Sequence, residues 1–264
     1  MQATMRGRYA AVNGEVPTID AGPRKTYARL IGALFLVGFL TYGIGFTLVN
    51  SVITVPDFVS TIPGVQTTLL FGAFLMLLNT VVDIGKGVLF FPILEHHGRR
   101  TALVYLAAIV VQVVFLDLGV IFLLMLAPLA QIAADAGASS AAWAPGLGLL
   151  LTESNTIAYN VGQATLSFGG VFLCLLLFRT RLIPQLLAGL GVAGYVLHGA
   201  GSVSELFGLP LSLFLLIPGA LFEVGIALWL IVKGFRPAAG AEAPSSSVSL
   251  DRPSGDVAPV AVSA

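Results

Sequence analysis

The chain has 264 residues, of which 57% are hydrophobic and only 10% are charged, and its formal net charge is zero. A soluble domain carries about 25% charged residues, so this composition excludes both a soluble globule and a disordered chain. The zero net charge provides no basic face for nucleic acid, and a single cysteine excludes a disulfide framework, which leaves an integral membrane protein.

The chain begins with a polar segment, residues 1–29, which we expect to form a cytoplasmic arm. The first apolar run follows at residues 30–49. A secretory signal peptide would place a shorter apolar run nearer the start and end it at a small-residue cleavage site, and neither feature is present. Residues 30–49 are therefore predicted to be a retained membrane helix.

Six segments contain the roughly 20 apolar residues that a helix needs to cross a bilayer. In chain order they are 30–49, 67–93, 102–128, 156–178, 185–207 and 211–233. Only Gly208, Leu209 and Pro210 separate the last two, and this turn signal predicts an antiparallel hairpin. The predicted fold class is all-α, a six-helix transmembrane bundle over residues 30–235. Residues 236–264, rich in Pro, Ser, Ala and Gly, are predicted to be a disordered cytoplasmic tail.

Basic residues predict the orientation, because Lys and Arg are retained on the cytoplasmic side of a membrane. The connections 50–66, 129–155 and 208–210 contain no Lys or Arg. Twelve of the thirteen Lys and Arg residues lie at or beyond helix ends on the opposite side, in the arm, in the two other connections and from the end of the last helix onward: Arg6, Arg8, Arg24, Lys25, Arg29, Arg99, Arg100, Arg179, Arg181, Lys233, Arg236 and Arg252. Both termini are therefore predicted to be cytoplasmic.

Polar and small residues recur at helical spacing, which places them on one face of each of five predicted helices. We expect these faces to point into the bundle, because polar groups are costly in lipid. They are Gly38, Thr41 and Gly45; Asn79, Asp83 and Lys86; Asn160, Gln163, Ser167, Gly170 and Cys174; Gly191, Tyr195, His198, Ser202 and Glu205; and Gly219, Glu223 and Ala227. The third helix is less regular, since Gln112 and Asp117 are separated by roughly 140° around its axis.

The ionisable residues within these helices are the candidate site: Asp83, Lys86, Asp117, His198 and Glu223. With all three acids ionised and one base present, this set would carry excess negative charge in a low dielectric, so at least one carboxyl is expected to hold a proton. An exchangeable proton is what a proton-coupled transporter or a cation site requires. The alternative is packing alone, in which Asp83 and Lys86 neutralise each other on one helix.

Several other patterns predict no chemistry. Residues 189–194 match GxGxxG, but they lie within a membrane helix, whereas the dinucleotide fingerprint needs a preceding strand. The adjacent His96 and His97 lack the spacing of a zinc motif, and His198 is alone within the helices, so no metal site or haem is expected. No cofactor is predicted.

The C-terminal third carries a pattern that resembles a known bacterial membrane family. Its segments are 181–184 (RLIP), 189–195 (GLGVAGY), 217–223 (IPGALFE) and 228–234 (LWLIVKG), together with Arg24-Lys25 and Asp83. Over about residues 24–235 the chain resembles the family known as domain of unknown function 4386. The resemblance implies a six-helix fold in a bacterial cell membrane and implies no activity. Gln112 and Asp117 depart from the Arg–Glu pairing of that family.

Three function classes remain open from the sequence. The first is a small transporter or channel-like protein whose interior carboxyls handle a proton, a cation or a small molecule. The second is a sensor or scaffold whose polar faces only assemble the bundle. The third is a membrane-embedded enzyme at the outer mouth near Glu153, Asn160 and Glu205, for which no catalytic constellation is present, so the sequence favours a protein that is not an enzyme. The oligomeric state is left open.

Overall fold

The computed structural model describes residues 21–137 and 140–236, and all the regular structure in these residues is helical. This confirms the predicted all-α class for the described part of the chain. The N-terminal arm up to residue 20 and the tail from residue 237 lie outside the described residues. The helices are α1 (Ala21–Ile53), α2 (Phe58–Leu124), α3 (Leu126–Ala136), α4 (Ala144–Thr180), α5 (Gln185–Leu206) and α6 (Ser212–Val232).

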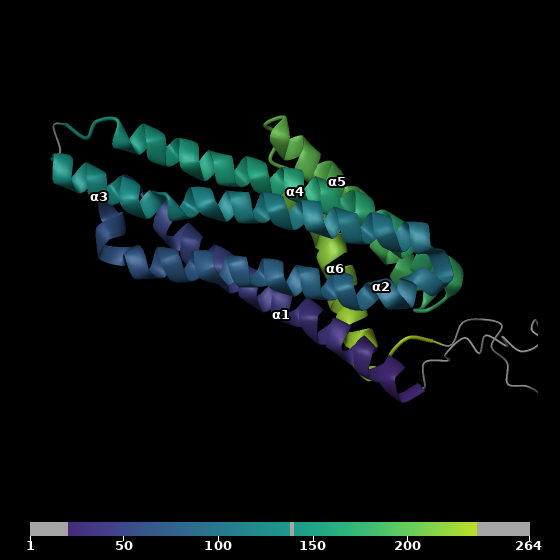
Figure 1. Cartoon of the computed structure of the whole chain (residues 1–264). Helices are drawn as coiled ribbons and strands as arrows, with labels where there is room; N and C mark the ends of the chain where they lie inside the picture. The colour runs from purple at the N-terminus through teal and green to yellow at the C-terminus, as the bar shows by residue number, and fades with distance from the viewer. Residues whose placement is uncertain (1–20, 138–139, 237–264) are drawn as a thin grey trace, which may run out of the picture.

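The longest helix, α2, turns back on itself at Gly98. Gly98 departs from helical geometry with φ 177° and ψ 78°, an extended conformation. The two limbs of α2, residues 58–97 and 99–124, then lie side by side (Figure 1). A Cβ atom placed on Gly87 of the first limb would lie 3.0 Å from Ile109 Cδ1 of the second. Among the described residues, five helices are long and apolar enough to cross a membrane, and the longest of these, Phe58–Ala136, contains the turn at Gly98.

The helices extend further than the apolar runs that predicted them. Helix α1 starts at Ala21, before the expected residue 30, and the expected connection 129–155 is largely occupied by α3 and the first turns of α4. Hydropathy detects only the length of chain that crosses lipid. Helical hydrogen bonding continues into water where Ala and Leu, strong helix formers, are frequent.

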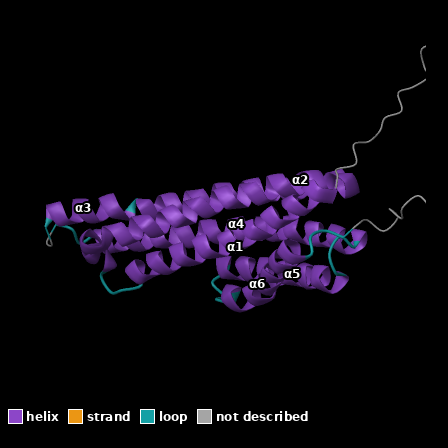
Figure 2. Ribbon diagram, turned by 90° about the horizontal axis from the view of Figure 1, so that it is seen from below, coloured by secondary structure: helices purple, strands orange, loops and turns teal. Residues whose placement is uncertain are grey.

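The buried core has two parts along the bundle. One part, which we call the α5–α6 core, contains residues of α1, α2, α4, α5 and α6, such as Phe35, Phe90 and Phe222. The other contains residues of α1 to α4 only, such as Leu69 and Leu123. Figure 2 shows α5 and α6 beside one part of the longer helices. With 37 residues α4 is about 55 Å long, whereas the 22 residues of α5 span about 33 Å, close to the thickness of a bilayer core.

The polar and small faces predicted from helical spacing are turned inward. Asn160, Gln163, Ser167, Gly170 and Cys174 of α4 are all buried. Small residues in these faces let backbones approach closely, as is usual between membrane helices. A Cβ atom on Gly194 of α5, for example, would lie 2.7 Å from the Cα atom of Gly219 in α6.

A glycine pair in α1 provides a matched test of this packing. A Cβ atom on Gly45 would lie 2.7 Å from the carbonyl oxygen of Gly72, whereas one on Gly43 would meet no atom within 4 Å. We expect Gly45→Ala to lower the free energy of unfolding by about 1–3 kcal/mol, because the backbones of α1 and α2 must separate. Gly43→Ala should be neutral or stabilising by up to about 1 kcal/mol. Unfolding of both variants in mixed micelles measures the difference, and equal effects would contradict the close approach.

Candidate functional site

An ion pair lies inside the first limb of α2. The Lys86 Nζ atom is 2.6 Å from Asp83 Oδ1, and both side chains are largely buried. The two residues are one helical turn apart, so the local sequence alone brings them together. Among the described residues this is the only ion pair.

Amide groups complete the surroundings of Asp83. Its Oδ2 atom accepts a hydrogen bond from Asn79 Nδ2 at 3.2 Å and another from Gln112 Nε2, on the second limb of α2, at 3.3 Å. The Oε1 atom of Gln112 is buried without a partner. Both oxygens of Asp83 therefore have partners, Lys86 at Oδ1 and two amide groups at Oδ2.

Helix α1 makes room for the Lys86 side chain and covers it. The Cα of Gly38 faces Asn79 and Lys86, and a Cβ atom there would lie 3.8 Å from Lys86 Nζ. One turn earlier, the ring of Phe35 lies against the ammonium group, with 4.7 Å between Nζ and the ring centroid. A cation over an aromatic face is stabilised more strongly where water is excluded. Lys86 is thus held between a carboxylate and an aromatic ring.

Glu223 of α6 has a less complete set of partners. Its Oε1 atom accepts a hydrogen bond from the Tyr195 hydroxyl of α5 at 3.0 Å, whereas Oε2 takes part in no hydrogen bond within the described residues. Pro218, five residues earlier, lacks the backbone N–H that would bond the Phe214 carbonyl oxygen. Gly219 allows α5 to pass close to α6 at this depth.

Lys86 interacts with both carboxyl groups, although it forms an ion pair only with Asp83. Its ammonium group interacts electrostatically with Glu223 as well as with Asp83. The structure therefore gathers Asp83, Lys86 and Glu223 from two helices into one cluster, which we call the acid–lysine cluster. With all three groups ionised the cluster carries one net negative charge, and one bound proton or monovalent cation would neutralise it.

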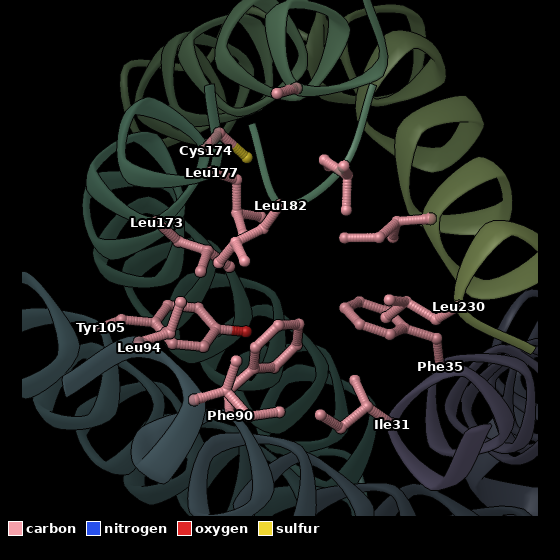
Figure 3. Packing of buried hydrophobic residues seen from close by; sticks show 14 of the residues in the cluster. Ile31, Phe35, Phe90, Leu94, Tyr105, Leu173, Cys174, Leu177, Leu182 and Leu230 are labelled. Carbon is pink, nitrogen blue, oxygen red and sulfur yellow. The ribbon is translucent and has the colours of Figure 1, made fainter. Parts of the chain in front are cut away.

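Aromatic side chains of the α5–α6 core pack together beside Lys86 of the acid–lysine cluster, where Phe35 covers the ammonium group. Figure 3 shows Phe35, Phe90 and Tyr105 among the leucines of this core, with the Tyr105 hydroxyl pointing into it. Phe90 packs edge to face against both Phe35 and Tyr105, with ring centroids 6.2 and 5.9 Å apart. Such surroundings keep water away from the charges and strengthen their interactions.

The two other predicted site residues lie outside this cluster. His198 is buried, with its Nε2 atom 3.0 Å from Gln163 Oε1 of α4 and its Nδ1 atom without a partner. Asp117 is only partly buried, and its Oδ1 atom is buried without a partner. No hydrogen bond or ion pair among the described residues joins either side chain to Asp83, Lys86 or Glu223.

Clefts lie elsewhere on the described part of the bundle. One, between α1, α2 and α4, is too narrow for a water molecule and is lined by Tyr42, Met76, Leu116, Val120, Asn155 and Tyr159. Another, of about 80 Å³, lies where α1 passes the end of α6. Within the described residues no three His, Cys, Asp or Glu side chains are placed to hold a metal ion. His97, for which the sequence analysis predicts no metal site, has its Nδ1 atom 2.9 Å from the Ile93 carbonyl oxygen.

Two side chains that contact the acid–lysine cluster, Phe35 and Tyr195, are not among the site residues predicted from the sequence. Phe35 was not considered, although it lies one turn before Gly38 on the inward face of α1. Tyr195 was placed on the inward face of α5 but was given no role. Helical spacing could have placed both residues at the interior, but only tertiary packing determines which polar group each one meets.

Long apolar helices enclosing a buried ion pair define a multi-pass α-helical membrane protein. The chain belongs to the family described as Domain of unknown function (DUF4386), which matches residues 30–234. This confirms the resemblance seen in the sequence. Neither the curated proteins nor the solved structures contain a match to the chain.

Proposed function

We propose that this protein carries protons across a bacterial cell membrane, either alone or coupled to a solute, with Glu223 as the group that takes up and releases the proton. The observation that carries the proposal is the asymmetry between the two acids of the acid–lysine cluster. Asp83 has a partner at both oxygens, whereas Glu223 has one hydrogen bond and a more distant cation. The less satisfied carboxyl is the one that gains more from binding a proton.

The surrounding groups suit a proton better than a metal ion. One free carboxylate oxygen and one tyrosine hydroxyl supply far fewer oxygen ligands than the six to eight that a calcium ion takes. A proton needs only the Oε2 atom of Glu223. Tyr195 would orient the carboxyl, and Lys86 would stabilise the charge that remains when the proton leaves. Access to Glu223 would come from movement of α5 and α6, which meet at Gly194 and Gly219.

We further propose six membrane crossings with both termini in the cytoplasm. The turn of α2 at Gly98 supports counting its two limbs separately, and the twelve basic residues at or beyond the ends of the predicted membrane segments support the orientation. Reporter fusions after Phe58 and Trp143 should report the outside of the cell, and fusions after Arg99 and Arg236 the inside. An inside signal at either Phe58 or Trp143 would contradict this topology.

Proton movement in proteoliposomes tests the proposed activity. Purified full-length protein is reconstituted with a pH-sensitive dye inside, and an outward or inward pH gradient is imposed with and without candidate solutes. We expect the gradient to decay faster than in protein-free vesicles, either at once or on addition of the coupled solute. Decay that matches empty vesicles under all conditions would favour the scaffold or sensor hypothesis. If a cation crossed the vesicle membrane without proton movement, that cation and not the proton would be the transported species.

A further inference from the structure

A second polar feature, separate from the acid–lysine cluster, lies at the end of the bundle where α1 begins and α6 ends. The pocket of about 80 Å³ at this place is lined by Lys25 and Arg29 of α1 and by the end of α6, residues 230–234, including Lys233. The two helices touch on either side of it. A Cβ atom on Gly32 would lie 2.6 Å from the Ala227 carbonyl oxygen, and one on Gly234 would lie 3.7 Å from Ala28 Cβ.

The described residues give the pocket a positive charge. Lys25, Arg29 and Lys233 line it, and no acidic side chain of the described part of the chain does. The only ion pair among the described residues joins Lys86 to Asp83, so none of these three cations has a carboxylate partner there. The last carbonyl groups of α6 attract cations, but a helix C-terminus carries only about half a negative charge. The C-terminus of α6 can therefore explain why one basic side chain lies here, but not why three do.

The size of the pocket limits what it can hold. A cavity needs about 10–15 Å³ of water-accessible space to hold one water molecule, so about 80 Å³ admits a group of a few heavy atoms such as a phosphate. Lys and Arg are the side chains that bind phosphate oxygens, through charge-assisted hydrogen bonds. Apolar side chains lie next to the basic ones: Leu30 is 48% exposed and Val232 is 69% exposed. Both belong to helices apolar enough to cross the membrane, so a lipid whose phosphate entered the pocket could lay its acyl chains along them.

We propose that this pocket binds the phosphate group of an anionic membrane lipid, with Lys25, Arg29 and Lys233 as its ligands. The site does not depend on the proposed proton transport, because it shares no residue with the acid–lysine cluster. Bound lipid would join the first turns of α1 to the last turn of α6. It would stabilise the protein by binding the folded state alone.

Thermal unfolding of the full-length protein in detergent, with added phosphatidylglycerol, tests the site. Phosphatidylcholine, whose phosphate is paired with a choline cation, and inorganic phosphate are the comparison ligands. We expect phosphatidylglycerol to raise the unfolding temperature in a saturable way and the other two to have much smaller effects. If inorganic phosphate raised the unfolding temperature as much as phosphatidylglycerol does, the pocket would bind phosphate but not specifically a lipid. If phosphatidylcholine did so, the proposed anionic site would be wrong.

Charge-removal variants locate the effect. The triple variant Lys25→Gln, Arg29→Gln, Lys233→Gln should bind phosphatidylglycerol about a hundredfold more weakly, since each basic residue near an anionic lipid contributes about fivefold. The single variant Arg29→Gln should show the fivefold loss in a protein that keeps two cations. The matched control Arg99→Gln, Arg100→Gln, Arg179→Gln removes three exposed charges outside the pocket and should keep the wild-type affinity within a few-fold. An equal loss in the control would show diffuse surface attraction and overturn the proposal.

Discussion

Replacing Lys86 by methionine is expected to lower the free energy of unfolding by about 3–5 kcal/mol, because it leaves the Asp83 carboxylate buried without its cation. Methionine keeps much of the length and apolar volume of the lysine stem, so lost packing against Phe35 contributes little. The two amide hydrogen bonds to Asp83 Oδ2 remain but do not neutralise the charge. Unfolding in mixed micelles, followed by circular dichroism, measures the loss.

Two further variants separate the ion pair from simple damage to the helix. Asp83→Asn alone should cost less than Lys86→Met, because Lys86 still interacts with Glu223. The double variant Asp83→Asn, Lys86→Met should recover most of the stability, since no buried charge of the pair remains unpaired. The unpartnered Oε1 atom of Gln112 is then available to accept a hydrogen bond from the new amide. A double variant as unstable as Lys86→Met would contradict the account of the pair.

The second large effect is expected at Glu223. Glu223→Gln keeps the size of the side chain and an oxygen that can accept the hydrogen bond from Tyr195, but it cannot release a proton at neutral pH. We expect proton movement in proteoliposomes to fall to the level of empty vesicles, while the variant inserts, purifies and unfolds like the wild type. A rate loss of this size with unchanged folding distinguishes a functional carboxyl from one that only packs.

Glu205 provides the matched control for this change. It is an acid of the adjacent helix, partly exposed near the α5–α6 turn, where its Oε2 atom accepts a bond from the Ser212 backbone N–H at 3.4 Å. Glu205→Gln removes the same charge and should leave proton movement close to wild type. An active Glu223→Gln variant with an unchanged pH profile would remove Glu223 from the proposal and favour the scaffold hypothesis.

Local sequence patterns predicted the parts of the site that depend on one helix. The spacing of Asn79, Asp83 and Lys86 places them on one face, and their burial follows from the cost of exposing them to lipid. Spacing also indicated that Glu223 and Tyr195 face the interior. Their mutual hydrogen bond depends on how closely α5 and α6 approach at Gly194 and Gly219, and periodicity within one helix does not contain that information.

The structure differs from the sequence-based expectations in two places: the grouping of the candidate site residues, which depends on tertiary packing, and the ends of the helices, which hydropathy does not determine. Asp117 and His198 were grouped with the acids because all are ionisable and lie within apolar helices. No hydrogen bond or ion pair among the described residues joins them to the acids of the cluster, so the group divides: His198 pairs with Gln163, and Asp117 stays apart. The helical extension through α3 and the start of α4 was expected to be a loop, because polar residues such as Gln131 and Asp135 end the apolar run without ending the helix.

Infrared difference spectroscopy of the protein in membranes measures the protonation state of Glu223 directly. A protonated carboxyl in an apolar site has a C=O stretching band that disappears when the proton leaves. We expect such a band in the wild type at neutral pH. It should decline as the pH is raised, be absent from Glu223→Gln, and persist in Glu205→Gln. A wild-type spectrum without this band across the pH range, or a band that survives in Glu223→Gln, would contradict the account.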